Sequence, residues 1–254
     1  FTYDPEIRLK KRLSYYFKNF FYNPYFILKY MLYEWNFVRK FKKKLFNFSN
    51  SSNSKIIYVK HHDAHAASAY YMSGFSKTAY YTLDWRGEWE TTTSGTYVNS
   101  KLNQLNSSEY PNSLGLFYNA LTTYLGFGSN DEYKVMGLSS YGTPKFVDDF
   151  LKIISVKNGK LLINKEYIDE FRYPFLKKKF YQKFGPSRKP DSKISKHYIN
   201  IASSVQKIFE DCAISQINYL QKATKLKKLV IAGGCALNGL MIGKIIEKTN
   251  FKKV

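Results

Sequence analysis

Apolar and polar positions follow two different periods along this chain, and these periods predict which segments are helices and which are strands. Residues 1–50 place apolar side chains on one stripe at helical spacing, with lysines extending outward, so we expect a basic helical segment. Short runs typical of strands occur at Ile56–Val59, Thr78–Leu83 and Leu229–Ala232, and Thr91–Val98 is a Thr-rich segment that predicts a further strand. Strands that alternate with helices along a chain indicate an α/β fold.

Further helices are expected between and after these strands. Ser113 is the predicted N-cap of one of them, because Leu114, Phe117, Tyr118 and Leu121 follow it at helical spacing. Three more helices are predicted at Asp148–Ser155, His197–Gln221 and Leu237–Glu247.

The same pattern suggests how the chain is divided. Ser49–Ser54 is a polar run of Ser and Asn that predicts a linker, so residues 1–55 are expected to form the basic helical segment. Residues 56–254 are expected to form the main domain. Within it, Lys157–Lys189 is basic and aromatic with no clear period, so residues 143–196 are interpreted as an insertion or loop-rich part.

The composition agrees with a folded protein of this class. The chain has 254 residues, of which 44% are hydrophobic, enough for a core and too many for wholesale disorder. It has two cysteines, Cys212 and Cys235, which excludes a disulfide scaffold and a zinc module built from cysteines. Both cysteines are interpreted as small core residues.

The charge raises the question of a nucleic-acid partner. The chain has 40 Lys and Arg residues against 19 Asp and Glu, for a net charge of +21, and 18% of its residues are aromatic. Only six of the basic residues are arginine, the side chain that nucleic-acid surfaces use for forked contacts. Residues 61–142 carry 4 basic and 7 acidic side chains, so the excess charge lies elsewhere. We expect no specific nucleic-acid surface; a basic, non-enzymatic RNA-associated module is an alternative supported by charge and aromatic content alone.

No membrane partner is expected either. The most apolar stretch, Tyr15–Trp35, is interrupted by Lys18, Pro24, Lys29 and Glu34, and falls short of the roughly 20 apolar residues that a bilayer span needs. The beginning of the chain does not have the pattern of an export signal.

Three of the four histidines lie within five positions, and this cluster is the first candidate for chemistry. If Asp63–Tyr71 is helical, His61 and His65 lie one turn apart, where two imidazoles can reach one metal ion. His62 would point elsewhere and is a candidate hydrogen-bonding or acid/base residue. Two nitrogens do not complete a metal site, so a carboxylate is needed from another part of the chain. The alternative is that the histidines cap a helix or line the core.

Two turns could serve a phosphate or a metal. Asp84 ends a predicted strand and is followed by Gly87, a pattern that suits either a phosphate-handling loop or an ordinary hairpin. Gly233 and Gly234 lie between a strand and a helix, where backbone N–H groups and the helix dipole favour an anion, although tight packing explains a Gly pair equally well.

Taken in order, these pieces resemble the NodU/CmcH carbamoyltransferase family, the O-carbamoyltransferases of nodulation-factor and antibiotic tailoring. The resemblance extends over nearly the whole chain from residue 57 onward, and the histidine and EYKVMGL segments are its most specific parts. The matching segments are His61–Phe75, Asp84–Trp89, Ser113–Tyr118, Glu132–Gly142, Phe184–Pro190, His197–Gln206 and Ala232–Asn238.

The resemblance implies a partial actin-like, ribonuclease-H-like duplicated α/β fold and a metal- and nucleotide-binding domain over residues 56–254. His61 and His65 would bind a divalent metal, usually iron in this family, that holds the phosphates of ATP or carbamoyl-adenylate. Lys134 and Arg188 fall within matching motifs, and Lys134 is included with the nucleotide-binding residues. The full set implied to line the nucleotide is Asp84, Gly87, Lys134, Gly233, Gly234 and Asn238.

The implied reaction is the transfer of a carbamoyl group, made available from carbamoyl phosphate and ATP as carbamoyl-adenylate, to a hydroxyl of a small molecule or sugar. The metal and backbone N–H groups would stabilise developing charge. His62 is the candidate catalytic residue. The dependence on ATP, with no export signal, leads us to expect a cytoplasmic enzyme. The threonylcarbamoyl transfer enzymes of tRNA modification are the nearest enzymatic alternative, and the Phe184–Pro190 and His197–Gln206 segments favour the small-molecule branch.

The chain departs from the family pattern at several points. Trp85 follows Asp84 where the family commonly has Gly, and Ile242 stands where a second Asn is common. Family members also have a phosphate-binding segment before the region that matches Phe1, and, beyond the region that matches Val254, an aspartate that completes the metal site and a second domain. We therefore expect this chain to be an internal piece of a carbamoyltransferase that is inactive alone.

Overall fold

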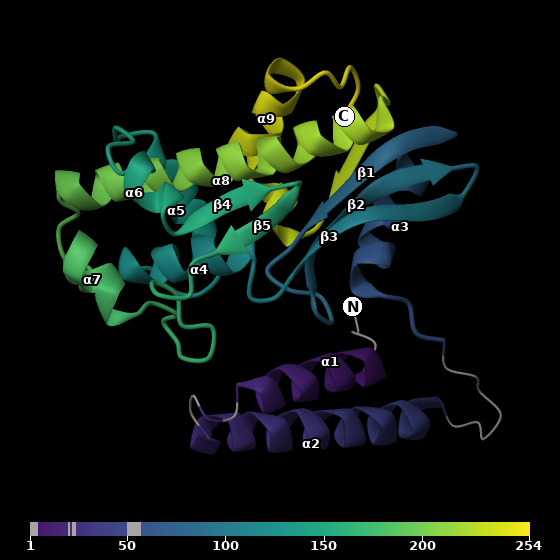
Figure 1. The fold of residues 1–254 in the computed structure, drawn as a ribbon, viewed down its shortest axis with the longest axis horizontal. Helices are drawn as coiled ribbons and strands as arrows, with labels where there is room; N and C mark the ends of the chain where they lie inside the picture. Colours follow the sequence, from purple (N-terminus) through teal and green to yellow (C-terminus); the bar gives the residue numbers. More distant parts are fainter. Residues whose placement is uncertain (1–4, 20, 22–23, 50–56) are drawn as a thin grey trace. The chain divides into compact units, whose positions relative to one another are not determined.

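The computed structural model describes residues 5–19, 21, 24–49 and 57–254 (Figure 1). Contacts within the chain divide it into two units. The first consists of Phe1–Ala64 with Gly87–Trp89, and the second of His65–Arg86 with Glu90–Val254.

The first unit contains the helices α1 (Pro5–Lys18) and α2 (Pro24–Ser49), which lie side by side (Figure 1). Glu34 of α2 is almost completely buried and binds two arginines of α1, Arg8 and Arg12. The distance from Arg8 Nε to Glu34 Oε2 is 2.8 Å. The prediction of a basic helical segment is confirmed for the described residues, while the predicted linker lies outside them apart from Ser49, which ends α2.

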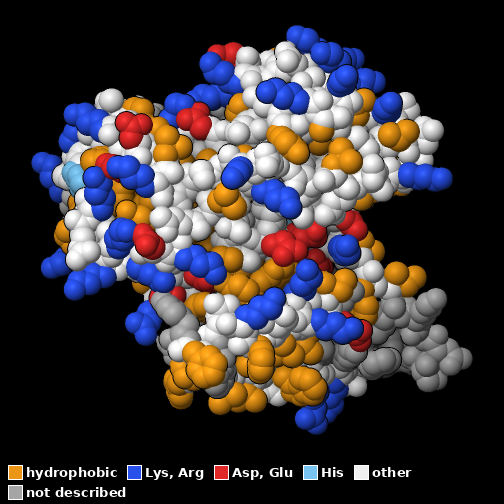
Figure 2. Space-filling view, in the orientation of Figure 1, with side chains coloured by type: hydrophobic (Ala, Val, Ile, Leu, Met, Phe, Trp, Pro, Cys, Tyr) orange, Lys and Arg blue, Asp and Glu red, His pale blue; other side chains and the backbone are white. Residues whose placement is uncertain are grey.

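Apolar side chains are exposed on these helices in addition to the lysines. Aromatic and aliphatic side chains gather on the surface of α1 and α2 in Figure 2, and Phe17, Tyr25, Leu32 and Trp35 are more than half exposed. The predicted outward position of the lysines is confirmed at Lys10, Lys11, Lys18 and Lys40, and these apolar side chains are exposed beside them.

The second unit is built around a four-stranded sheet with the order β3-β2-β1-β6. Strands β1, β2 and β3 are antiparallel neighbours, and β6 pairs with β1 in parallel. The bounds of the strands are β1 Lys77–Leu83, β2 Glu90–Val98, β3 Lys101–Glu109 and β6 Leu229–Ala232. The sheet confirms the predicted α/β class, with a mixed sheet rather than a purely parallel one.

Helices cover both faces of this sheet. Alternate residues of a strand point to opposite faces, so Tyr80 and Tyr81 of β1 meet different helices. Tyr80 packs with Ala66 and Tyr70 of α3 (His61–Ser73) on one face. On the other face, the Tyr81 hydroxyl donates to Gln216 Oε1 of α8 (Lys196–Thr224) at 2.9 Å. The central strand is therefore buried on both sides.

Most of the predicted elements of this unit are confirmed within a few residues. Ser113 is the N-cap of α4, and its hydroxyl oxygen accepts from Leu116 N–H at 3.0 Å. The predicted strand at Ile56–Val59 is wrong, since Ile57–Val59 form no strand in the structure and α3 begins at His61. The remaining elements are α4 Leu114–Tyr124, α5 Glu132–Ser139, α6 Val147–Leu151, β4 Ile154–Lys157, β5 Lys160–Ile163, α7 Lys178–Phe184, the 3-10 helix η2 Gly234–Leu237 and α9 Gly239–Lys248.

Among the described helices, none combines the length and apolar character required to cross a membrane.

The parallel pairing of β1 with β6 positions the residues of the candidate site. It aligns Thr82 with Ala232, so Asp84 and the Gly233–Gly234 turn follow neighbouring strands at the same edge of the sheet.

Candidate metal and nucleotide site

Helix α3 carries a histidine near its N-terminal end, and this histidine lies beside the carboxylate of the residue that directly follows strand β1. His65 Nε2 lies 3.1 Å from Asp84 Oδ2. α3 is one continuous helix, so its first turn carries His61 one turn before His65. Among the residues that the structure describes, His61, His65 and Asp84 are a group whose side chains could hold a metal ion. Sequence reasoning named both histidines as ligands and assigned Asp84 to the nucleotide.

The start of α3 is fixed by Glu88, which sequence reasoning did not single out. Its carboxylate accepts from His61 N–H, at 3.0 Å from Oε1 and 3.2 Å from Oε2. Burial raises the pKa of Asp63 in the same turn. Gly87 lies beside Glu88 in the first unit and does not line the cavity that contains Asp84. His62 has no exposed surface. In the described structure, this segment therefore shapes the end of a helix.

The Gly233–Gly234 turn lies directly against the end of β1. Gly233 has a φ of +109°, and a Cβ atom there would lie 2.2 Å from the carbonyl oxygen of Leu83. Only glycine fits such a close approach. The next N–H group, that of Gly234, donates to Asp84 Oδ2 at 3.3 Å. The turn thus places a backbone donor and the Asp84 carboxylate side by side.

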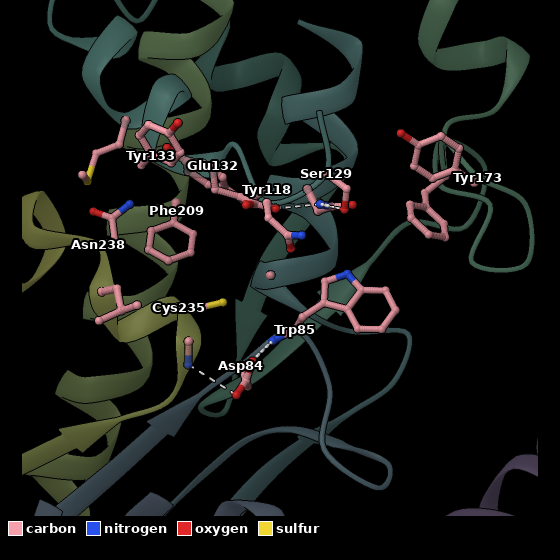
Figure 3. A pocket seen from close by; sticks show the side chains of 17 residues that line it. Asp84, Trp85, Tyr118, Ser129, Glu132, Tyr133, Tyr173, Phe209, Cys235 and Asn238 are labelled. Atoms are coloured by element: carbon pink, nitrogen blue, oxygen red, sulfur yellow. Dashed lines mark hydrogen bonds between the residues drawn. The ribbon is translucent and has the colours of Figure 1, made fainter. Parts of the chain in front are cut away.

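A cavity of about 610 Å³ opens beside Asp84 within the second unit, and Figure 3 shows how its lining side chains point inward. This volume lies within the range of roughly 300–1,000 Å³ that is usual for small-molecule sites. The lining residues are Asp84, Trp85, Gly115, Tyr118, Asn119, Ser129, Asn130, Glu132, Tyr133, Met136, Tyr173, Phe175, Phe209, Gly234, Cys235, Leu237 and Asn238. Of the predicted nucleotide residues, Asp84, Gly234 and Asn238 are brought together here.

The polar groups of the cavity include a second carboxylate, Glu132. Asn119 Nδ2 donates to Glu132 Oε1 at 2.6 Å. Two residues further on, Lys134 does not line the cavity. Its ammonium group lies 3.0 Å from Asp131 Oδ2, and this hydrogen bond lowers the pKa of Asp131. Glu132 and Asn119 were missed by sequence reasoning, although Glu132 begins the EYKVMGL motif.

Asn238 is held by a buried network behind the cavity wall. Its Oδ1 atom accepts from Met241 N–H at 3.0 Å and caps α9. Gln206 of α8 exchanges two hydrogen bonds of 2.9 Å with the Asn238 amide. The Tyr118 hydroxyl donates to Gln206 Oε1 at 2.8 Å, and Gln206 Nε2 donates to Glu210 at 2.8 Å. Gln206 was not a predicted site residue, because its spacing identifies only a position on a long helix.

Arg188 has a structural role in the described chain. Its guanidinium group donates to the carbonyl oxygens of Leu125 and Ser192, both at 2.6 Å. It is largely buried and does not line the cavity. Arg188 therefore ties the turn after α4 to the loop before α8.

The sequence profile described as Carbamoyltransferase N-terminus matches residues 10–254. This chain belongs to the carbamoyltransferase family.

Individual relatives match this carbamoyltransferase chain over segments of similar length. An uncharacterised Synechocystis protein, sll1178, is 36% identical over 207 residues, which cover 78% of this chain and 33% of that protein. Nodulation protein NolO of Bradyrhizobium diazoefficiens is 30% identical over 204 residues, 77% of this chain and 34% of the relative. Nodulation protein NolNO of Sinorhizobium fredii is 29% identical over 205 residues, 79% of this chain and 28% of the relative. The chain thus spans about a third of the length of these curated relatives.

Proposed function

We propose that this chain carries the metal and nucleotide site of an O-carbamoyltransferase. In the proposed reaction, carbamoyl-adenylate made from carbamoyl phosphate and ATP gives its carbamoyl group to a hydroxyl of a small molecule or sugar. The observation that carries the proposal is the 3.1 Å approach of His65 Nε2 to Asp84 Oδ2 beside a cavity of small-molecule size, in a chain of the carbamoyltransferase family.

The side chains present fit a divalent transition metal. Two imidazoles and one carboxylate form the donor set of many iron(II) sites, and the same donors suit zinc. His61, His65 and Asp84 would hold the ion, with open coordination positions for a substrate. When bound, the ion would supply positive charge to phosphate oxygens and Lewis acidity toward a carbonyl group.

The charge of the cavity supports a metal-dependent nucleotide site. Asp84 and Glu132 line the cavity, and none of the described lining residues is Lys, Arg or His. Two carboxylates repel a phosphate unless a cation lies between them, because like charges in a cavity of low dielectric interact strongly. We propose that the nucleotide occupies the side of the cavity formed by Gly234, Cys235 and Asn238, with its phosphate toward Asp84.

Glu132 and Asn119 are proposed to bind the ribose. A carboxylate that accepts from sugar hydroxyls is a recurring means of nucleotide recognition. Glu132 Oε1 already accepts from Asn119, which fixes the carboxylate in place. Figure 3 shows Glu132 and Tyr133 on the same side of the cavity as Asn238.

The chemical step forms one bond and breaks another. The acceptor oxygen bonds to the carbamoyl carbon, the bond from that carbon to the phosphate oxygen breaks, and AMP leaves with the electron pair. The hydroxyl proton passes to solvent water. The contribution proposed for this chain is to align donor and acceptor and to surround the reacting carbonyl with fixed dipoles, which is worth several orders of magnitude in rate.

The proposal includes an actin-like, ribonuclease-H-like fold and a cytoplasmic location. The strand order β3-β2-β1-β6, with an antiparallel three-stranded part and a parallel fourth strand beside β1, supports an actin-like, ribonuclease-H-like domain. Use of ATP supports a cytoplasmic enzyme. The buried His62 stays a candidate catalytic residue that would need to become accessible to act.

Calorimetric titration of the chain with AMP, with and without Mn²⁺, tests the proposal. We expect saturable AMP binding that requires Mn²⁺ and is at least tenfold weaker in Asp84→Ala. Lys134→Ala is the matched control, because its ammonium pairs with Asp131 outside the cavity, and it should bind AMP within twofold of wild type. AMP binding of equal strength without metal and in Asp84→Ala, or no AMP binding, would contradict the proposal.

A further inference from the structure

Helix α2 of the first unit has a buried side and a second, exposed row of apolar side chains. Ile27 and Glu34 lie on the buried side, and Glu34 binds the arginines of α1. The exposed row is spaced by three and four residues, so its members lie along one side of the helix. We call this row the outer stripe, and it consists of Tyr25, Leu28, Leu32 and Trp35.

The outer stripe is a continuous surface rather than a set of isolated side chains. Each of its four residues is more than half exposed, and Tyr25 is 80% exposed. Figure 2 shows apolar side chains gathered on the surface of α1 and α2. Single exposed apolar residues are ordinary on a protein, whereas a contiguous exposed row marks a surface that another molecule covers.

The charge of α2 restricts what that molecule is. The helix contains six basic residues and one acidic residue, Glu34. Because Glu34 is buried and bound to Arg8 and Arg12, the charged side chains at the surface of α2 are all basic. Along the sequence, no Asp or Glu follows Glu34 until Asp63. Four exposed basic side chains lie in the second half of α2, and we call them the basic end: Arg39, Lys40, Lys43 and Lys44.

A bilayer with anionic headgroups matches both parts of this surface. The boundary between headgroups and acyl chains accommodates aliphatic side chains such as Leu28 and Leu32. Tyr and Trp favour the headgroup level, where an apolar ring and a polar group are both accommodated. A cluster of four or more Lys and Arg residues on an amphipathic helix is attracted to anionic lipids.

Other occupants fit this surface less well. A second copy of α2 offers no acidic side chain to the basic end, so like charges would meet. Single-stranded RNA binds by stacking its bases on aromatic rings, and Leu28 and Leu32 in the middle of the outer stripe have none. A helix that lies on a bilayer does not need the uninterrupted apolar run of a spanning helix, so Lys29 and Glu34 do not exclude this mode of binding.

We infer that α1 and α2 bind the surface of an anionic lipid bilayer. The outer stripe enters the headgroup region, and the basic end contacts the lipid headgroups. The helix α2 lies in the plane of the membrane surface and does not cross it. This inference does not depend on the proposed carbamoyl transfer, since it rests on residues of the first unit that are outside the cavity.

Flotation of the chain with lipid vesicles tests the inference. Vesicles of phosphatidylcholine alone are compared with vesicles in which about a third of the lipid is phosphatidylserine. We expect binding to the anionic vesicles that is at least tenfold tighter than to the neutral ones and that weakens as salt is added. The double variant Leu32→Gln, Trp35→Gln removes part of the outer stripe, and it should bind the anionic vesicles at least fivefold more weakly than wild type.

A second variant tests the basic end separately. Replacing its four residues, by Arg39→Gln, Lys40→Gln, Lys43→Gln and Lys44→Gln, should weaken binding at least tenfold, because each basic residue near the surface adds to the attraction. All of the substituted side chains are exposed, so the helices should be retained, which far-ultraviolet circular dichroism checks. Trp35→Tyr keeps an interfacial ring and should bind within twofold of wild type.

Matched controls come from exposed positions of the second unit. For the outer stripe the control is Tyr141→Gln with Leu151→Gln, at side chains that are 75% and 49% exposed. For the basic end the control removes four exposed lysines, by Lys222→Gln, Lys227→Gln, Lys252→Gln and Lys253→Gln. Binding of both controls within twofold of wild type, with loss in the two α2 variants, supports the inference.

Four results would overturn the inference. The first is no flotation of wild type with the anionic vesicles, and the second is equal binding to anionic and neutral vesicles. The third is that the controls lose as much binding as the α2 variants, because charge or apolar surface in general would then explain the binding. The fourth is a different occupant: polyuridylate bound more tightly than the vesicles, or a dimer in sedimentation equilibrium that Leu32→Gln with Trp35→Gln dissociates.

Discussion

Gln206 and Asn238 face each other with their side-chain amides paired, each donating one hydrogen bond of 2.9 Å to the other. The pairing joins the middle of α8 to the N-cap of α9. Since the Asn238 oxygen is occupied by Gln206 and by Met241 N–H, the N–H of Asn238 that Gln206 does not use is its remaining donor. Asn238 lines the cavity, so Gln206 decides how this donor is presented there.

Replacing Gln206 by Leu should therefore destabilise the second unit, because it removes hydrogen bonds from several other side chains. Tyr118, Asn238 and Glu210 would each lose a partner in a buried setting, and the free energy of unfolding should fall by about 2–4 kcal/mol. Urea unfolding followed by circular dichroism measures this change. Gln104→Leu is the control, because Gln104 makes an exposed hydrogen bond to Glu90 and should alter the free energy by less than about 0.5 kcal/mol. Equal effects of the two substitutions would contradict the role given to Gln206.

Gly233→Ala should be among the most damaging single changes in the second unit. The added Cβ would lie 2.2 Å from the Leu83 carbonyl oxygen at a φ of +109°, so β1 or β6 must move. We expect a loss of more than about 3 kcal/mol, or failure to fold. Gly243→Ala is the matched control within α9: nothing lies within 4 Å of the added atom, and helix propensity favours Ala by about 0.5–1 kcal/mol. A tolerated Gly233→Ala would show that the turn does not depend on this close approach.

The two thiols should react slowly at neutral pH. Burial raises the pKa of Cys212 to about 12, and burial followed by the nearby Asp84 carboxylate raises the pKa of Cys235 well above its usual range. The thiolate is the reactive form, so the rate of labelling by iodoacetamide in the metal-free chain should rise about tenfold per pH unit from 7 to 10 without reaching a plateau. An unperturbed thiol, with a pKa of about 8.5, levels off near pH 9. Cys235 is half-buried and lines the cavity beside Asp84. A plateau below pH 10 for Cys235 would mean that this thiol is not desolvated and is not affected by the Asp84 carboxylate.

Glu34 should be essential to the helix pair of the first unit. Glu34→Gln removes the negative charge that compensates two buried arginines, Arg8 and Arg12, and should destabilise the pair by about 3–5 kcal/mol. Amide hydrogen exchange over α1 and α2 would show the loss as faster exchange of both helices. Lys40→Gln, at an exposed position of α2, should leave the exchange unchanged. Unchanged protection in Glu34→Gln would contradict a structural role for the buried ion pair.

The sequence was most informative where local rules decide the structure. The N-cap at Ser113, the buried strand at Leu229–Ala232 and the helix that carries His61 and His65 all follow from spacing and capping. Strand β3 was missed because it is an edge strand with Lys, Asn, Gln and Ser at mostly exposed or half-exposed positions, and its pairing with β2 is fixed by register rather than by hydrophobicity.

The sequence likewise predicted some residues of the candidate site and not others. The motifs predicted Asp84, Gly234 and Asn238, because each stands at a strand or helix end, where side chains and N–H groups face a cavity. Lys134 was placed with the nucleotide because it lies in a matching motif, yet its neighbour Asp131 attracts its ammonium group out of the cavity. Tyr173, Phe175 and Gln206 could not be predicted, because they come from a loop and a helix far from Asp84 in the sequence that only tertiary packing brings to the same cavity region.

His61, His65 and Asp84 are proposed to bind one divalent metal ion. Titration of the metal-free chain with Co²⁺, followed by its visible absorption and by calorimetry, tests it most directly. We expect one ion per chain with a ligand-field spectrum of nitrogen and oxygen donors, lost in His65→Ala and in Asp84→Ala and retained in Lys134→Ala. Binding of one ion with the same spectrum and affinity in His65→Ala and Asp84→Ala, or no binding by wild type, would contradict the account.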